Sequence, residues 1–215
     1  MGKIFYLMGK SASGKDTIYQ KLMRDEELML NPIVLYTTRP IRDGELDGVD
    51  YHFVSEEQVE KLGREGHIIE MRTYDTVYGP WRYLTVDDGQ IDLSKKNYIV
   101  IGTLESFLKV MDYFPADQVV PIYVYLDDGK RLEWAMEREK RQRIPRYSEM
   151  CRRFLADEKD FSTEHLKRCG LIHKITNRDG EELIEYTENA FFNSNSEECT
   201  ARIKKFIQSF VTVQP

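Results

Sequence analysis

Apolar residues in this chain gather in short runs that alternate with longer amphipathic segments. The runs are rich in β-branched and aromatic residues and end at turn-forming residues, which predicts strands at Ile4–Met8, Pro32–Tyr36, Tyr98–Ile101, Pro121–Leu126 and Ile172–Thr176. The amphipathic segments predict helices at Thr17–Arg24, Glu105–Tyr113, Lys130–Arg141, Ser148–Arg168 and Ser196–Phe210. Strands that alternate with helices favour an α/β fold, in which helices cover both faces of a parallel central sheet.

Residues 37–88 interrupt this alternation. A helix is predicted at Ser55–Glu65 and a strand-like segment at Ile68–Met71, but the preceding stretch TTRPIRDGELDGVDYHF fits neither periodicity. We therefore expect an inserted module within a single domain of 215 residues, a length that suits one α/β unit with a sizeable core.

The composition is that of an ordinary soluble enzyme, with 41% hydrophobic residues, 32% charged residues and a net charge of -6. Such a chain has no general attraction for nucleic acid or anionic membranes, so we expect neither as a partner, and any anion site must be local. Three scattered cysteines fit neither a disulfide framework nor a zinc pattern. No apolar run reaches the roughly 18 residues that a membrane span needs, and we expect a cytoplasmic protein.

The segment GKSASGKDT directly follows the first predicted strand and opens the first predicted helix. A glycine-rich loop in this position is typical of a Walker A phosphate-binding loop, whose backbone N–H groups and helix N-terminus bind phosphate. Lys15 would reach the β and γ phosphates. We expect the loop to bind ATP through Gly9, Lys10, Ser11, Ala12, Ser13, Gly14, Lys15, Asp16 and Thr17.

Asp16 stands where such a loop normally carries a hydroxyl residue that binds magnesium, and Thr17 follows it. A carboxylate is also a hard oxygen ligand and can bind the ion directly or through water. We therefore expect Mg2+ as the cofactor, with Asp16 and Thr17 as its protein ligands.

A phosphorylated acceptor would need its own cationic site, because two phosphorylated substrates repel each other. Arg39 and Arg42 can each bind phosphate through paired hydrogen bonds, and Tyr51 and Tyr78 offer neutral hydroxyl donors. The irregular stretch that interrupts the α/β pattern is therefore interpreted as an acceptor-binding loop.

These motifs resemble the guanylate kinase family, a branch of the nucleoside monophosphate kinases. The resemblance covers the phosphate loop, TTR followed by an arginine and GE, DGVDYHF, IIE, the YG pair and an arginine-rich segment. It implies a P-loop three-layer α/β/α fold with a core at 1–36, 89–130 and 155–215, a monophosphate-binding module at 37–88 and a helical lid at 131–154. It also implies transfer of a phosphoryl group from ATP to GMP or dGMP, by a monomer or homodimer.

The resemblance implies a role for each matching residue of the acceptor site. Arg39, Arg42, Tyr51 and Tyr78 look like ligands of the acceptor phosphate, and Glu45 resembles an acid that holds an arginine in place. Glu70 looks like the carboxylate that accepts hydrogen bonds from guanine N1–H and the exocyclic amine.

In the lid, family members carry two arginines about eleven residues apart. Arg141 and Arg152 reproduce that spacing, with Arg153 an equal candidate for the second role, and both would stabilise the transferring phosphoryl group. Asn177 is similar in position to the residue of the adenine-reading loop that follows the last core strand.

Two departures from the family leave alternatives open. Pro80 stands where the family has a small hydroxyl residue, and the strand YIVIGTLES lacks the family's acidic pair, so Asp16 and Thr103 would have to take over part of its work. The alternatives are a kinase that acts on another nucleoside monophosphate or a ribosyl bisphosphate, or a guanylate-kinase-like interaction module without catalytic activity.

Overall fold

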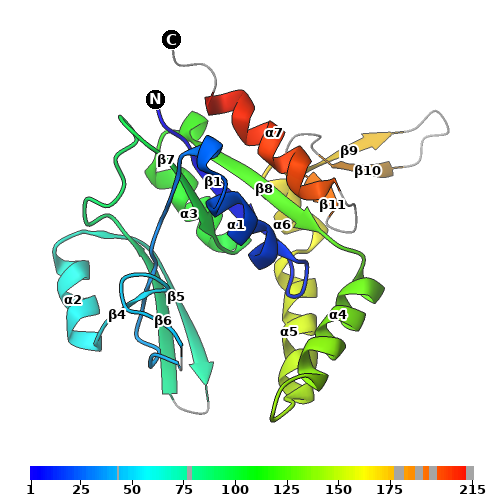
Figure 1. Cartoon of the computed structure of the whole chain (residues 1–215), viewed down its shortest axis with the longest axis horizontal. Helices are drawn as coiled ribbons and strands as arrows, with labels where there is room; N and C mark the ends of the chain where they lie inside the picture. Colours follow the sequence, from blue (N-terminus) through cyan, green and yellow to red (C-terminus); the bar gives the residue numbers. More distant parts are fainter. Residues whose placement is uncertain (43, 77–78, 177–181, 187–190, 194–197, 212–215) are drawn as a thin grey trace.

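The structure, a computed structural model of the chain, describes residues 1–42, 44–76, 79–176, 182–186, 191–193 and 198–211. Its core is a five-stranded sheet with the order β11-β8-β1-β7-β2, in which every neighbouring pair is parallel (Figure 1). The strands are β1 (Ile4–Met8), β2 (Leu30–Pro32), β7 (Asn97–Ile101), β8 (Val119–Tyr125) and β11 (Phe191–Asn193). The expected α/β fold with a parallel central sheet is confirmed.

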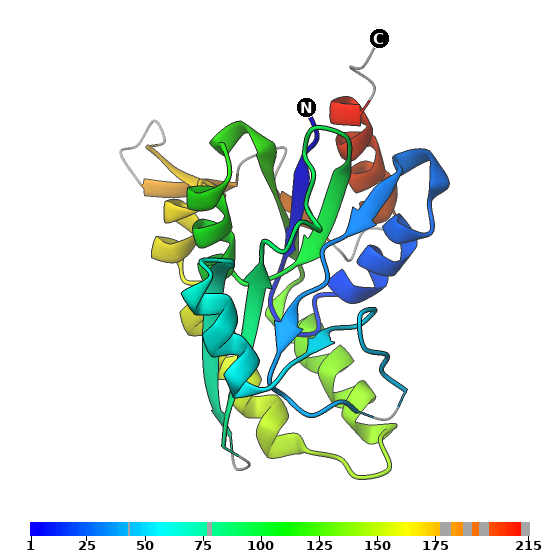
Figure 2. The same ribbon diagram turned by 90° about the vertical axis from the view of Figure 1, so that its left-hand side faces the viewer.

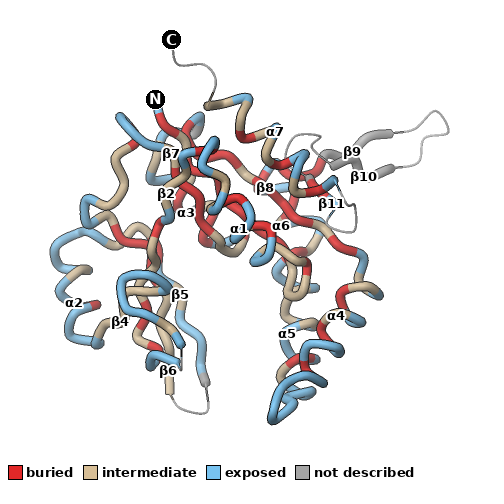
Figure 3. Tube along the Cα trace, viewed as in Figure 1, coloured by how far each residue is buried: buried red, intermediate tan, exposed pale blue. Residues whose placement is uncertain are grey.

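The central strand β1 shows why the sheet is covered on both faces. Phe5 and Leu7 pack with α1 (Lys15–Met23) and α7 (Cys199–Val211), whereas Ile4 and Tyr6 pack with α3 (Leu104–Tyr113) and α6 (Thr163–Arg168). Because every residue of β1 is buried, its sequence is a continuous apolar run and does not alternate (Figure 3).

The inserted module is built on a second sheet with the order β4-β3-β6-β5. Its strands are β3 (Tyr36–Thr37), β4 (His52–Phe53), β5 (Ile68–Thr76) and β6 (Gly79–Val86). The helix α2 (Glu56–Arg64) begins with a capping box formed by Ser55 and Gln58, and Val59 packs it onto β6.

Two further helices, α4 (Asp128–Lys140) and α5 (Tyr147–Asp160), extend from the core beside the phosphate loop. Figures 1 and 2 show the module and this helix pair as two arms that project from the same end of the core sheet. The remaining elements are the short helices η1 (Glu26–Leu28) and η2 (Ala116–Gln118) and the antiparallel pair β9 (Ile172–Thr176) and β10 (Glu182–Tyr186). No helix in the described ranges is both long and apolar enough to cross a bilayer.

Three expectations about individual elements are wrong. Ile172–Thr176 does form a strand, but it pairs with β10, and the edge place in the core sheet belongs to β11. Pro32–Tyr36 is divided between the end of β2 and the start of β3, because the chain leaves the core sheet there and enters the second sheet. Ser148–Arg168 is two helices, α5 and α6, separated at Phe161, whose buried ring stacks on Tyr123.

Gly102, at the end of β7, is a glycine for reasons of packing. A Cβ atom built on it would lie 2.5 Å from Cε1 and Cζ of Tyr6, whose ring fills the space beside it. Tyr6 is 1% exposed and donates a hydrogen bond of 2.7 Å from its hydroxyl to Ser106 Oγ. Burial raises the pKa of Tyr6 well above its ordinary value, so the phenol stays neutral.

We expect Gly102→Ala to lower the free energy of unfolding by about 1 to 3 kcal/mol, the usual cost of overpacking a filled core. The double variant Tyr6→Leu/Gly102→Ala should lose less than the sum of the two single changes, because the methyl group then occupies space that the ring has vacated. Gly63→Ala is the matched control, since its nearest neighbour is Ile68 Cδ1 at 3.7 Å and alanine favours a helix interior. Additive losses in urea denaturation would contradict this account of Gly102.

Candidate active site

The phosphate loop joins β1 to α1 with backbone geometry that favours glycine at two places. Gly14 has φ 84°, in the left-handed region, immediately before α1 begins at Lys15. A Cβ atom on Gly9 would lie 2.5 Å from the Val124 carbonyl oxygen and 2.7 Å from Ser13 Oγ. The close approach of the loop to β8 therefore excludes any side chain at Gly9.

The polar side chains of the loop are arranged for an anion. Lys15 Nζ lies 3.5 Å from the Lys10 carbonyl oxygen, and burial lowers the pKa of Lys15, partly offset by Asp16 and Asp157. Ser13 Oγ is buried and has no hydrogen-bond partner within the part of the chain that the structure describes. A buried donor that is unsatisfied in this way is suited to a ligand atom.

Asp16 and Thr17 are exposed in the first turn of α1, beside Lys15. Both offer hard oxygen donors, which fits Mg2+. Among the described residues no group of three or more His, Cys, Asp and Glu side chains could hold a metal.

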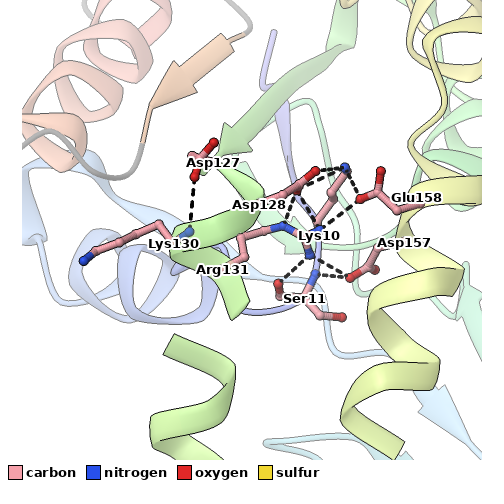
Figure 4. A network of polar contacts seen from close by, with 8 residues as sticks. All are labelled: Lys10, Ser11, Asp127, Asp128, Lys130, Arg131, Asp157 and Glu158. Carbon is pink, nitrogen blue, oxygen red and sulfur yellow. Dashed lines mark hydrogen bonds and ion pairs between the residues drawn. The ribbon is translucent and has the colours of Figure 1, made fainter. Parts of the chain in front are cut away.

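A buried arginine connects the loop to both helices of the second arm (Figure 4). Arg131, on α4, is 1% exposed, and its Nη1 donates to the Ser11 carbonyl oxygen at 3.1 Å and to Asp157 at 3.2 Å. Its Nε donates to Asp128 at 2.9 Å and its Nη2 to Glu158 at 3.1 Å. The guanidinium therefore holds the loop, α4 and α5 together.

The backbone and side chains of the loop also take part in this network. The Ser11 N–H donates to Asp157 Oδ2 at 2.8 Å, and Lys10 Nζ contacts Glu158 at 2.5 Å and Asp128 at 3.3 Å. Lys10 thus contacts carboxylates of both α4 and α5 and helps to join the phosphate loop to these two helices.

A cavity of about 680 Å3 lies between the two arms. Arg42 and Trp81 line it from the module, Ser11 lines it from the phosphate loop, and α4, α5 and the turn between them complete it. Its arginines are Arg42, Arg131, Arg138, Arg143, Arg146 and Arg153, against the carboxylates Glu139 and Glu149. This local excess of cations would suit an anion, which the acidic chain as a whole does not attract.

Of the three predicted lid arginines, one lines this cavity. Arg153 lines it, whereas Arg141 is 82% exposed, pairs with Glu137 at 3.7 Å and is not among its lining residues. Arg152 also does not line the cavity and binds Glu149, as Arg153 does. These hydrogen bonds, that of Arg152 above all, lower the pKa of Glu149 to about 2.

On the module, Arg39 is 3% exposed and its guanidinium binds Glu45 through two hydrogen bonds of 2.8 and 3.0 Å. Glu45 Oε2 also accepts the Arg42 N–H at 2.8 Å, and the hydrogen bonds with Arg39 lower the pKa of Glu45. The rings of Tyr51 and Phe53 lie 5.4 and 5.6 Å from the Arg39 guanidinium carbon. The expectation that Glu45 holds an arginine in place agrees with this geometry.

Glu70, on β5, is completely buried and paired. Its Oε1 accepts hydrogen bonds from Thr85 Oγ1 at 2.7 Å and Arg72 Nη2 at 3.2 Å, and its Oε2 accepts Arg72 Nε at 3.1 Å. Burial opposes the charge of Arg72, but Glu70 raises the pKa of Arg72 above its ordinary value. Glu70 is therefore buried, as a recognition carboxylate would be, but it faces Arg72 and Thr85.

Two predicted ligands, Tyr78 and Asn177, lie outside the described residues. The premise for Asn177, that it follows the last core strand, is wrong, because β9 is not in the core sheet. The residue that ends the last core strand is Asn193, in β11.

Sequence reasoning missed Arg72, Arg131, Asp157 and Tyr83. Tyr83 packs edge to face with Tyr51 at 5.8 Å, beside Arg39. Arg131 and Asp157 stand in charged helices, where an exposed face is the usual interpretation. The one available signal for Arg72 was its place two residues after Glu70 on a strand, which puts both side chains on the same face.

We expect Arg131→Met to lower the free energy of unfolding by about 3 to 5 kcal/mol, because it leaves buried and half-buried carboxylates without their cation. Lys130→Met, next to it on α4, is the matched control and should have little effect, since the ion pair of Lys130 with Glu133 is exposed. Urea denaturation measures both. Similar losses for the two variants would contradict the structural role of Arg131.

Comparisons with known proteins find relatives from one family. The profile of the family described as "Guanylate kinase" matches residues 1–144. The chain is 40% identical over 93 residues to the guanylate kinase of Oceanobacillus iheyensis, covering 41% of this chain and 45% of that protein. It is 38% identical over 100 residues to the guanylate kinase of Neisseria gonorrhoeae, covering 46% of each. The matched stretches thus span somewhat under half the length of these relatives.

The crystal structure of guanylate kinase from Anaplasma phagocytophilum superimposes with a TM-score of 0.58 at 21% identity, and the match covers 97% of this chain and 86% of that one. A likeness at this identity concerns the fold, and it extends past residue 144, where the family profile ends. The phosphate loop, the inserted module and the profile match over two thirds of the chain lead to one conclusion. The chain belongs to the guanylate kinase family.

Proposed function

We propose that this protein transfers the γ-phosphoryl group of ATP to a nucleoside monophosphate, with GMP or dGMP as the acceptor. The observation that carries the proposal is the cavity in which Ser11 of the phosphate loop, Arg42 of the module and the arginines of α4 and α5 meet. One cation-rich space bordered by two anion sites is what transfer between two phosphorylated substrates requires.

On the donor side, the loop amides and the N-terminus of α1 would bind the phosphates of ATP, and Lys15 would reach the β and γ groups. Mg2+, held by Asp16 and Thr17 with the phosphate oxygens, would neutralise charge on the donor. For adenine we propose Asn193, at the end of the last core strand, in place of Asn177.

On the acceptor side, Arg39, Arg42 and Tyr51, with Tyr78, would bind the monophosphate. Glu45 holds the Arg39 guanidinium by two hydrogen bonds, so the acceptor phosphate meets an arginine already fixed in orientation. Burial raises the pKa of Tyr51, and its hydroxyl therefore remains a donor at neutral pH.

Around the transferring group, Arg138 and Arg153 line the cavity and are the arginines that the geometry favours. Arg141 and Arg152 would join them only if α4 and α5 moved toward the module, which is how a lid closes over substrates.

We propose that the chain is divided into three functional regions. They are a core at 1–36, 89–130 and 155–215, a module at 37–88 and a lid at 131–154. A cytoplasmic location is proposed from the three scattered cysteines.

A phosphoryl acceptor other than GMP is the second candidate. It is favoured by the two departures from the family resemblance in the base region, Pro80 and the lack of an acidic pair in YIVIGTLES. An interaction module without activity is disfavoured, because Gly9, Gly14 and Lys15 keep the loop geometry that phosphate binding needs.

The proposal is tested by measuring ADP release with ATP, Mg2+ and a panel of nucleoside monophosphates. We expect GMP or dGMP to be preferred over AMP by about 10² to 10³ in kcat/KM, because the 6-amino edge of adenine mismatches a site built for a 6-oxo group. Lys15→Ala should abolish transfer and leave GMP affinity unchanged, and Lys21→Ala, exposed on the same helix, is its control. Equal use of AMP, CMP, UMP and GMP would contradict the guanine assignment.

Arg39 and Arg42 should differ in one measurable respect. Replacing either by methionine should weaken GMP binding by on the order of 2 to 4 kcal/mol, the cost of losing a charge-assisted contact to a phosphate. Only Arg39→Met should also lower the free energy of unfolding, because Arg39 is buried against Glu45 whereas Arg42 is exposed. Calorimetry and urea denaturation measure the two effects, with Arg64→Met as the exposed control. Unchanged GMP affinity in both variants would remove the acceptor site from the proposal.

A further inference from the structure

The buried ion pair of Glu70 and Arg72 restricts what Glu70 can bind. An ionised carboxylate has about four lone-pair positions for hydrogen bonds. Three are taken, since Oε1 accepts from Thr85 and Arg72 and Oε2 accepts from Arg72. The side chain of Glu70 is 0% exposed. Glu70 can therefore accept at most one further hydrogen bond, through Oε2, and cannot accept from two donors of a base.

Arg72 is the partner that faces open space. Its side chain is 10% exposed and lines a cavity of about 520 Å3 with Tyr74 and Thr103, and Glu70 does not line that cavity. Two of the five guanidinium N–H donors are used by Glu70, and the contact of Nη1 with Thr103 Oγ1 is long, at 3.5 Å. The pair therefore presents hydrogen-bond donors of Arg72 where a free Glu70 would present acceptors.

The neighbouring strand supplies no carboxylate to replace Glu70 in that role. β7 ends at Ile101 and is followed by Gly102 and Thr103, and the ring of Tyr6 occupies the space that a side chain on Gly102 would need. Tyr6, Ser106 and Thr103 are joined by hydrogen bonds, of 2.7 Å from Tyr6 to Ser106 and 3.1 Å between Ser106 and Thr103. The cavity does have two acids, Glu105 and Asp160, but Glu105 is exposed and pairs with Lys109 at 3.1 Å.

We infer that Arg72 determines base specificity, and that the acceptor is recognised as a 6-oxopurine nucleotide whatever its 2-substituent; this rests on the proposed function. Arg72 donates to O6, a contact that arginine makes well and that Pro80 cannot make. Glu70 is enclosed by Arg72 and Thr85 and does not line the cavity, so the 2-amino group of guanine has no acceptor in the pair. GMP and IMP, which lacks only that amino group, are then nearly equivalent acceptors.

The test compares GMP, IMP and AMP with the wild-type protein, by calorimetric binding and by kcat/KM with ATP and Mg2+. We expect GMP and IMP to lie within about tenfold of each other, because the group that distinguishes them finds no acceptor on Glu70. AMP should be weaker than both by about 10² or more. A preference of 100-fold or more for GMP over IMP in binding would overturn the inference.

Arg72→Ala frees two acceptor positions on Glu70, so it should weaken IMP binding and raise the GMP-to-IMP ratio above tenfold. Arg72→Gln, which retains an amide but not the paired contact, is the second variant if the alanine protein does not fold. Arg64→Ala, exposed on α2, is the control and should keep the wild-type ratio. A wild-type ratio in both Arg72 variants would overturn the inference.

The calorimetric binding measurements distinguish a failure of this inference from a failure of the proposed function. If no monophosphate supports ADP release, phosphoryl transfer is the part that fails, while equal binding of GMP and IMP still supports the role of Arg72. If neither GMP nor IMP binds, this inference and the proposed acceptor both fail.

Discussion

The position of the arm formed by α4 and α5 depends on the burial of one cation. Arg131 is 1% exposed, and a guanidinium out of water is costly unless carboxylates and carbonyl groups surround it. Asp128, Asp157, Glu158 and the Ser11 carbonyl oxygen do so, and they come from α4, α5 and the phosphate loop. Only together can these elements supply all the hydrogen-bond partners of Arg131. The loop that would bind ATP therefore positions the start of α4 and the end of α5.

The same pairing of arginine with carboxylate recurs wherever the protein would meet a phosphate or a base. Glu45 holds Arg39, Glu149 holds Arg152 and Arg153, and Glu70 holds Arg72. A phosphate that binds Arg153 competes with a carboxylate for the same donors, which lowers its affinity and favours ligands of higher charge. In a chain with a net charge of -6, these pairs keep cations in place without a basic surface.

The sequence predicted those parts of the fold that are determined locally. The phosphate loop, the central strand and most helices follow from short-range pattern and turn chemistry. It could not predict that Ile172–Thr176 would pair with Glu182–Tyr186, because an apolar run indicates a strand without indicating its neighbour. The acceptor loop stays a prediction, although Glu45 does pair with Arg39. Arg131 and Arg72 were missed because their importance comes from partners distant in sequence or from burial.

The absence of an acid at the end of β7 has a physical origin in the core. The ring of Tyr6, on the central strand, can be buried there only if position 102 has no side chain. With no carboxylate there, Glu70 remains the recognition carboxylate that the family resemblance implies, and Arg72 pairs with it at 3.1 Å. The packing of Tyr6 inside the sheet and the ion pair of Glu70 with Arg72 on the module thus both act on the surface where we propose that the base is recognised.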